Sequence, residues 1–290
     1  MNKILVPTDF SEISQETLLY AFRFAEKHEK SLHIVHVLEL YQYAAGTTES
    51  DLLSSILPPE NITEMEKNAL EILKKQINTV VSTHNLKVHH DFKVLPGHLV
   101  NDIIAESIAA DCELLILPIT EKGSQVTRFS HRAVTSIIND SIVPVLAVKH
   151  PKFEPFKCLV YATDFKRTDI YALKHLSKLF ENSDNQIIVT HINTKKDDFK
   201  TELLFEGFKN RVNAEIPDKN IVFESLYDKS IINGIISTVC QNNADGVVML
   251  KDNESIFSSL FETSNTEKLV HSIEIPMIIY HNQHPQEIYK

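Results

Sequence analysis

Two aspartates and two histidines recur at the same spacing in the two halves of this sequence. Asp9 closes the apolar run of LVPTDF, and Asp164 closes that of LVYATDF 155 residues later. The same interval separates His36 in LHIVHVLE from His191 in IIVTHIN. A carboxylate at the end of a buried strand can hold a ligand or cap the helix that follows, so both roles stay open for the aspartates. Each histidine lies inside an apolar run, which is more typical of a packed histidine than of a ligand-binding one.

Other clusters of reactive side chains point less clearly to a site. The HHD sequence at 89–91 has metal-ligand residue types. Neighbouring strand residues face opposite sides, however, so His89 and His90 do not easily share one ion and we expect no metal site. The three cysteines are isolated and odd in number, which argues against a disulfide framework and a zinc ribbon. Because the GxSxG, GxxxxGK and HExxH motifs are absent, we expect no catalytic residues.

The charge of the chain limits the classes of partner. The 290 residues include 39 acidic and 29 basic ones, which gives a formal net charge of -10. This charge repels nucleic acid and anionic membrane surfaces, so we expect neither as a partner. No run of about 18 uncharged apolar residues occurs, and Asp9 falls where a signal peptide is still hydrophobic. These features predict a soluble, cytoplasmic protein with reduced cysteines.

The repeated residues belong to a duplicated unit. Asn101 in NDIIAESIAA falls on Asn233 in NGIISTVCQN, and Pro144 falls on Pro276, both at a spacing of 132 residues. The spacing is shorter here than at the start of the repeat, so the first copy carries additional residues in its middle. These residues lie mainly at about 41–61.

In both copies, short apolar runs alternate with helical patterns. The first copy predicts strands at 3–8, 32–37, 86–95, 113–118 and 144–149, with helices at 14–28, 62–83, 98–109 and 128–139. The second predicts strands at 158–163, 186–192, 220–227, 246–250 and 276–281, with helices at 167–182, 198–214, 230–242 and 261–272. Buried strands separated by helices form parallel sheets, so the fold class is α/β, with two tandem five-stranded parallel-sheet sandwiches. The proline-containing stretch at 148–157 places the domains at 1–150 and 154–284.

Three stretches of the first copy carry a family resemblance: ILVPTDFSE, HIVHV and the long segment from LLILPITEKG to VPVLAVKH. They resemble the universal stress protein family, here as a tandem member with two copies. The resemblance implies a Rossmann-like fold of the adenine nucleotide alpha hydrolase type in each copy. It also implies a stress-response or regulatory protein that acts by binding protein partners and a small ligand. The alternative is an ATP-binding member that hydrolyses ATP slowly.

The resemblance also implies where a nucleotide would bind. In this family the first strand ends in an aspartate beside the adenine, and a G-x2-G-x9-G-[ST] segment after the fourth strand wraps the ribose and phosphates. By this correspondence Asp9 and Val37 belong to a first site, and Asp164 and Ile192 to a second. The glycine and hydroxyl positions fall on Pro118, Glu121, His131 and Arg132 in the first copy and on Leu250, Asn253, Thr263 and Ser264 in the second.

Neither copy retains the phosphate-binding glycines. Glycine allows a phosphate to approach backbone N–H groups closely, whereas Pro118 has no N–H and Glu121 adds negative charge. The second copy loses this carboxylate and offers the hydroxyls of Thr263 and Ser264. We therefore expect no resident cofactor, a degenerate first site, and weak binding of ATP or another adenylate in the second copy.

Two further expectations concern the assembly of the chain and the structure of the insertion. The strands at 145–148 and 277–280 are apolar enough to associate as edges, so we expect them to meet across a pseudo-twofold axis. One chain would then be equivalent to a dimer, and further pairing into a homo-oligomer stays open. The insertion at about 41–61 has apolar residues at helical spacing within 48–58, which predicts a short amphipathic helix.

Overall fold

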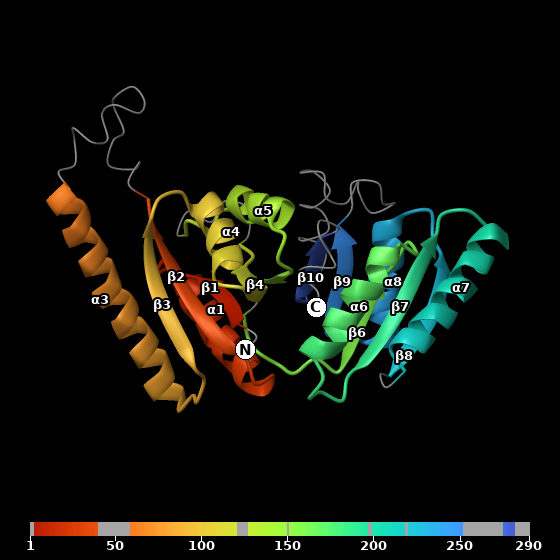
Figure 1. The fold of residues 1–290 in the computed structure, drawn as a ribbon. Coiled ribbons are helices and arrows are strands. Elements are labelled where there is room, and N and C mark those ends of the chain that lie inside the picture. The colour runs from red at the N-terminus through yellow and green to blue at the C-terminus, as the bar shows by residue number, and fades with distance from the viewer. Residues whose placement is uncertain are drawn as a thin grey trace, which may run out of the picture. The chain divides into compact units, whose positions relative to one another are not determined.

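The chain folds into α/β sheets in which strands and helices alternate (Figure 1). The computed structural model describes residues 3–39, 59–120, 127–149, 151–196, 199–217, 220–251 and 275–281. The chain divides into two compact units, Met1–Ile137 and Ile138–Lys290. The predicted α/β class with tandem, largely parallel sheets is confirmed. The domain limits 1–150 and 154–284, inferred from the proline-containing stretch between them, stay a prediction.

The first unit contains a parallel sheet with the strand order β3-β2-β1-β4. Its elements are β1 (Lys3–Pro7), α1 (Glu12–Lys27), β2 (Ser31–Leu38), α3 (Pro59–His84), β3 (His90–Pro96), α4 (Leu99–Ala109) and β4 (Cys112–Pro118), after which α5 (His131–Asp140) begins. All eight residues of β2 are buried, as expected for an inner strand covered on both faces. Helices α1 and α4 pack on the strands, and α3 packs on β2 and β3.

The second unit repeats this order of elements and begins with one additional strand, β5. Its elements are β5 (Val145–Val148), β6 (Cys158–Ala162), α6 (Arg167–Leu179), β7 (Gln186–Asn193), α7 (Phe199–Glu215), β8 (Ile221–Tyr227), α8 (Ile231–Asn242), β9 (Gly246–Lys251) and β10 (Met277–His281). The strand order is β5-β10-β9-β6-β7-β8. Strands β10, β9, β6, β7 and β8 run parallel, and β5 pairs antiparallel with β10.

The pairing of β5 with β10 confirms that the two apolar strands meet. Ala147 lies opposite Met277, and Val145 lies opposite Ile279. Both strands are entirely buried, so this pairing covers two edges that would otherwise expose apolar residues and unpaired backbone groups. The pseudo-twofold axis, and with it the equivalence of one chain to a dimer, stays a prediction.

Two packing features support the strand ends of the second unit. Gly234 of α8 lies so close to β7 that a Cβ atom there would be 2.5 Å from Cγ2 of Ile192. Phe205 and Phe208 of α7 pack against Phe165, with ring centroids 5.7 and 5.8 Å away. Thus α8 lies directly against β7, and α7 covers the turn that follows β6.

The predicted elements differ from the structure mainly at their ends. The strand expected at 86–95 begins only at His90, because its partner β2 begins at Ser31 and Leu32 pairs with His90. The helix predicted at 261–272 and the amphipathic helix predicted within 48–58 lie outside the described residues. No helix in the described ranges combines the length and apolar character needed to cross a membrane.

Candidate ligand sites at the strand ends

The Thr-Asp-Phe sequence forms the same turn in both units. Phe10 and Phe165 have φ angles of 66° and 67°, in the left-handed region that side chains of this size seldom adopt. The ring of Phe10 stacks on His36 with centroids 4.0 Å apart, and Phe165 packs on His191 at 4.2 Å. Each histidine Nδ1 donates to the carbonyl of the threonine before the aspartate, at 2.8 and 2.7 Å. Both histidines are therefore packing residues that support the turn.

In the first unit, the carboxylate of Asp9 is surrounded by donors from its own chain. Oδ1 accepts from the Ser11 amide at 3.0 Å and from the hydroxyls of Ser11 and Ser14, both at 2.5 Å. Oδ2 accepts from Thr127 Oγ1 at 2.6 Å and from the Arg128 amide at 2.5 Å. Burial alone would raise the pKa of Asp9, but these hydrogen bonds outweigh it and lower the pKa below its usual value. Asp9 thus ties the start of α1 to the loop after β4.

The same loop also occupies the second predicted position of the first site. Arg128 Nη1 donates to the carbonyl oxygen of Val37 at 3.1 Å. Residues 127–129 are held beside the end of β4 because Thr120 Oγ1 donates to the Phe129 carbonyl at 3.0 Å. A ligand at Asp9 and Val37 would therefore have to displace hydrogen bonds that the protein already makes.

In the second unit, Asp164 accepts no hydrogen bond from the described part of the chain. The donors of the turn go instead to Asp169, which is fully buried. It accepts from Tyr161 Oη at 2.8 Å, Thr163 Oγ1 at 2.7 Å and the Lys166 amide at 3.0 Å. Burial, followed by the nearby charge of Asp164, raises the pKa of Asp169 to about 7 despite these bonds. The Asp164 carboxylate therefore keeps its capacity to accept hydrogen bonds.

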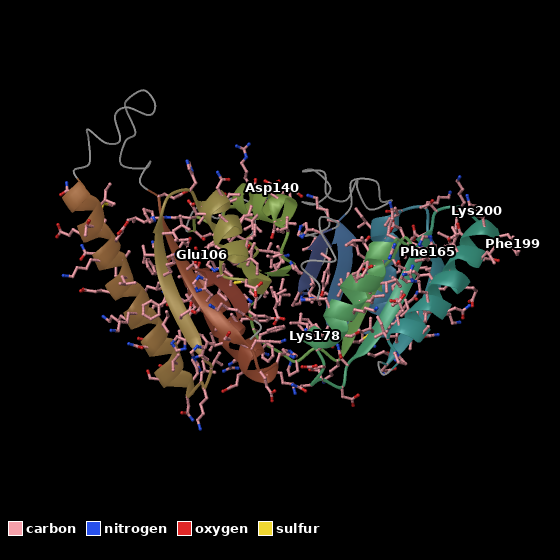
Figure 2. The ribbon with its side chains drawn as sticks, viewed as in Figure 1. Glu106, Asp140, Phe165, Lys178, Phe199 and Lys200 are labelled. Atoms are coloured by element: carbon pink, nitrogen blue, oxygen red, sulfur yellow. The ribbon has the colours of Figure 1, made fainter. Side chains whose placement is uncertain are left out.

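A cavity of about 400 Å³ opens beside Asp164. It is lined by the turn after β6, the end of β7 and the first turns of α7, namely Asp164, Phe165, Lys166, His191, Ile192, Asn193, Thr194, Lys195, Thr201 and Leu204. Figure 2 labels Phe165 at this edge of the sheet and Phe199 and Lys200 at the start of α7. The cavity combines one carboxylate acceptor with two lysines, so it suits a ligand that bears both donor groups and negative charge.

The structure brings together some of the residues predicted for the second site. Asp164 and Ile192 both line the cavity. Leu250, which is 2% exposed in β9, is not among its lining residues. Asn253, Thr263 and Ser264 lie outside the described residues, so their place near a ligand stays a prediction.

The sequence reasoning missed several residues that define these sites. Neither Thr127 nor Arg128 was identified as a hydrogen-bond partner of the first site. Asp169 had a readable signal, because it lies 155 residues after Ser14 and replaces a hydroxyl by a carboxylate. No sequence signal pointed to Lys195, because its place in the cavity depends on how α7 packs.

The HHD sequence takes part in an ionic cluster at the other end of the first sheet. Asp91 accepts from Lys3 at 3.0 Å and contacts His33 Nδ1, while His33 Nε2 lies 2.9 Å from Glu106. Lys93 also donates to Glu106 at 2.9 Å. Paired charges and hydrogen bonds of this kind join the starts of the strands to α4.

Comparison with known proteins identifies the family of this chain. The family described as universal stress protein matches residues 1–149. Universal stress protein MJ0531 of Methanocaldococcus jannaschii is 25% identical over 154 residues, which cover 52% of this chain and 84% of that protein.

Solved structures match the fold over nearly the entire chain. A universal stress protein from Archaeoglobus fulgidus is 18% identical with a TM-score of 0.68, over 97% of this chain and 96% of that chain. A protein of unknown function from Pseudomonas aeruginosa, PA1789, is 14% identical with a TM-score of 0.57, over 100% of this chain and 96% of that one. Because the family match spans half of the sequence, this chain belongs to the universal stress protein family.

Proposed function

We propose that this chain is a stress-response regulator that acts by binding, with a small-ligand site for an adenylate in its second unit and a degenerate first site. The observation that carries the proposal is the contrast between the two aspartates. Asp9 is saturated by its own chain, whereas Asp164 accepts no hydrogen bond from the described residues and faces a cavity of about 400 Å³. The family membership supports the stress-response role.

The contacts around each aspartate explain why the two sites should differ in affinity. A hydrogen bond to a charged oxygen contributes about 1.5–3 kcal/mol, so a ligand that replaces Thr127 and the Arg128 amide gains little. At Asp164 a ligand donor forms a new bond instead. Lys166 and Lys195 add positive charge for a phosphate, but no glycine-rich cradle replaces the lost positions, so binding should be weak.

Slow ATP hydrolysis is the alternative function. It requires a group that orients or deprotonates the attacking water and groups that bind the transferred phosphate. His191 is engaged through Nδ1 and packs on Phe165, which leaves Asp164 as the open carboxylate among the described residues of the cavity. We favour binding without turnover, through protein partners and with no resident cofactor. The three free thiols favour a reducing cytoplasm.

Titration calorimetry with ATP and magnesium tests the proposal. The wild type should bind with a dissociation constant in the micromolar range or weaker, and Asp164→Ala should weaken binding at least about tenfold. Asp9→Ala is the matched control and should leave the affinity unchanged. Submicromolar binding that is lost only in Asp9→Ala would overturn both the affinity and the location. Release of ADP by the wild type, abolished in Asp164→Ala, would favour the hydrolytic alternative.

A further inference from the structure

A second hollow adjoins the Asp164 cavity at the end of β7. It has a volume of about 800 Å³ and is lined by Asn193, Lys195, Lys196, Glu202, Phe205, Glu206, Ser225 and Tyr227. Asn193 and Lys195 also line the smaller cavity, so the two hollows share a wall. We take the two adjoining hollows together as the strand-end groove, whose lining extends from Asp164 past the end of β7 to Tyr227.

The floor of the strand-end groove follows the register of the strands. Asn193 lies opposite Tyr227, and Asn193 Nδ2 donates to Ser225 Oγ at 2.7 Å. From the end of β6 to the end of β8 the groove crosses two strand spacings, about 10 Å. Asp164 and Tyr227 therefore belong to different strand ends, with the end of β7 between them.

Aromatic and polar groups stand at both ends of the groove. The inner end has Asp164 beside Phe165, and the outer end has Tyr227, which is 38% exposed. Base stacking on such a ring is worth a factor of roughly 10 to 100 in affinity. Near Tyr227, Glu202 and Glu206 supply acceptors for the amino groups of a base.

Three lysines, Lys166, Lys195 and Lys196, line the groove. Lys195 lies in the shared wall, and Lys196 Nζ lies 5.1 Å from the centre of the Tyr227 ring. Lysine attracts phosphate, whereas the two glutamates on α7 repel it, so an anionic linker is favoured along the lysines. Positive charge thus lies between the two ends at Lys195, and also at the ends themselves, at Lys166 and Lys196.

We propose that the strand-end groove binds a dinucleoside polyphosphate. One base lies at Asp164, the phosphates lie along Lys195 and Lys196, and the second base stacks on Tyr227. This inference rests on the proposed function, because one half of the ligand occupies the adenylate site. A mononucleotide would leave the Tyr227 end unfilled. The net charge of -10 disfavours a long nucleic acid strand with the same bases.

Calorimetry with diadenosine tetraphosphate, ATP and the phosphodiester-linked dinucleotide pApA tests the inference. Diadenosine tetraphosphate should bind the wild type about 10-fold or more tightly than ATP, and pApA should bind no more tightly than ATP. Tyr227→Ala should remove the advantage of the longer ligand and leave ATP binding unchanged. Tyr227→Phe, which keeps the ring, should retain the advantage.

The outcomes separate this inference from the proposed function. Equal affinity for diadenosine tetraphosphate and ATP, or an advantage that survives in Tyr227→Ala, would overturn the dinucleotide inference and leave the adenylate site intact. Tight binding of pApA would show that the groove recognises bases without a polyphosphate linker and would also overturn it. Failure of both diadenosine tetraphosphate and ATP to bind would refute the proposed function itself. Circular dichroism of each variant checks that its fold is intact.

Discussion

The first and second units use the same turn for opposite purposes. Both retain a Thr-Asp-Phe turn in which a phenylalanine in the left-handed region packs on a histidine. In the first unit the aspartate fastens the turn to a distant loop, whereas in the second it lines a cavity. An aspartate at the end of the first strand is therefore not sufficient evidence of a ligand site.

The difference lies in what surrounds the aspartate. Ser14 donates its hydroxyl to Asp9, but the residue 155 positions later is Asp169, which cannot donate when ionised. Asp169 instead takes the donors of Thr163 and of the Lys166 amide. Two changes, from Ser11 to Lys166 and from Ser14 to Asp169, thus remove two hydroxyl donors from the turn, and Asp169 draws the Lys166 amide away from Asp164.

The largest effect expected from this comparison is on stability. Asp9→Ala removes an acceptor shared by Ser11, Ser14, Thr127 and Arg128, and should lower the free energy of unfolding by about 3 kcal/mol. Asp164→Ala removes no hydrogen bond within the described residues and should change it by less than about 0.5 kcal/mol.

Urea unfolding of both variants measures the two values. Asp9→Asn serves as a control, because it keeps the size and one acceptor oxygen of the side chain and should lose less stability than Asp9→Ala. Equal losses in Asp9→Ala and Asp164→Ala would mean that the two aspartates carry similar structural roles, and the comparison would fail.

Much of the fold was predictable from the sequence because burial leaves a strong pattern. The fully buried run of β2 and the apolar runs of β5 and β10 identified inner strands and paired edges. The start of β3 was missed because it depends on where its partner β2 begins. Hydrogen bonding between two strands requires residues on both of them, so the start of one strand cannot be read from its own segment alone.

The candidate sites were predictable only in part. Asp164 and Ile192 were located because the family motif fixes the ends of the first two strands. The hydrogen bonds that occupy Asp9 in the first site could not be predicted. Thr127 and Asp9 are 118 residues apart in the sequence and come together only in the folded chain. The walls supplied by α7 likewise depend on the packing of Phe205 and Phe208 against Phe165.

The second largest expected effect is a pH dependence of the free energy of unfolding, which Asp169 should cause in the second unit. The folded pKa of Asp169 is about 7, above the unfolded value of about 4. The folded state therefore binds more protons between these values, and the stability that this group contributes falls as pH rises from about 4 to 7.

Asp169→Asn removes this titration. Between pH 5 and pH 8 the wild type should lose about 2–3 kcal/mol of unfolding free energy relative to the variant. Urea unfolding at both pH values gives this difference, and the comparison with the variant cancels the other titrating groups. Ser14, the counterpart in the first unit, supplies the control, since Ser14→Ala should change stability equally at the two pH values. A constant difference between wild type and Asp169→Asn would contradict the buried-acid interpretation.

The smallest effect concerns two helical glycines on either side of the second site. At Gly234 of α8 a Cβ would meet Cγ2 of Ile192 at 2.5 Å, so Gly234→Ala must displace β7 or α8. This overpacking costs about 1–3 kcal/mol, and the gain in helix propensity offsets roughly 1 kcal/mol of it. The net loss should therefore be about 1 kcal/mol. Because Ile192 lines the cavity, ATP binding should weaken as well.

Gly207 of α7 is the matched control, because nothing lies within 4 Å of a Cβ built there. Gly207→Ala should raise the free energy of unfolding by roughly 0.5–1 kcal/mol through helix propensity alone. It should leave ATP affinity unchanged. If both substitutions stabilise the protein and neither alters binding, the close approach of α8 to β7 does not shape the Asp164 cavity. Opposite signs for the two glycines would instead show that α8 is closely packed on β7 at Gly234, whereas the Gly207 position of α7 has room for a side chain.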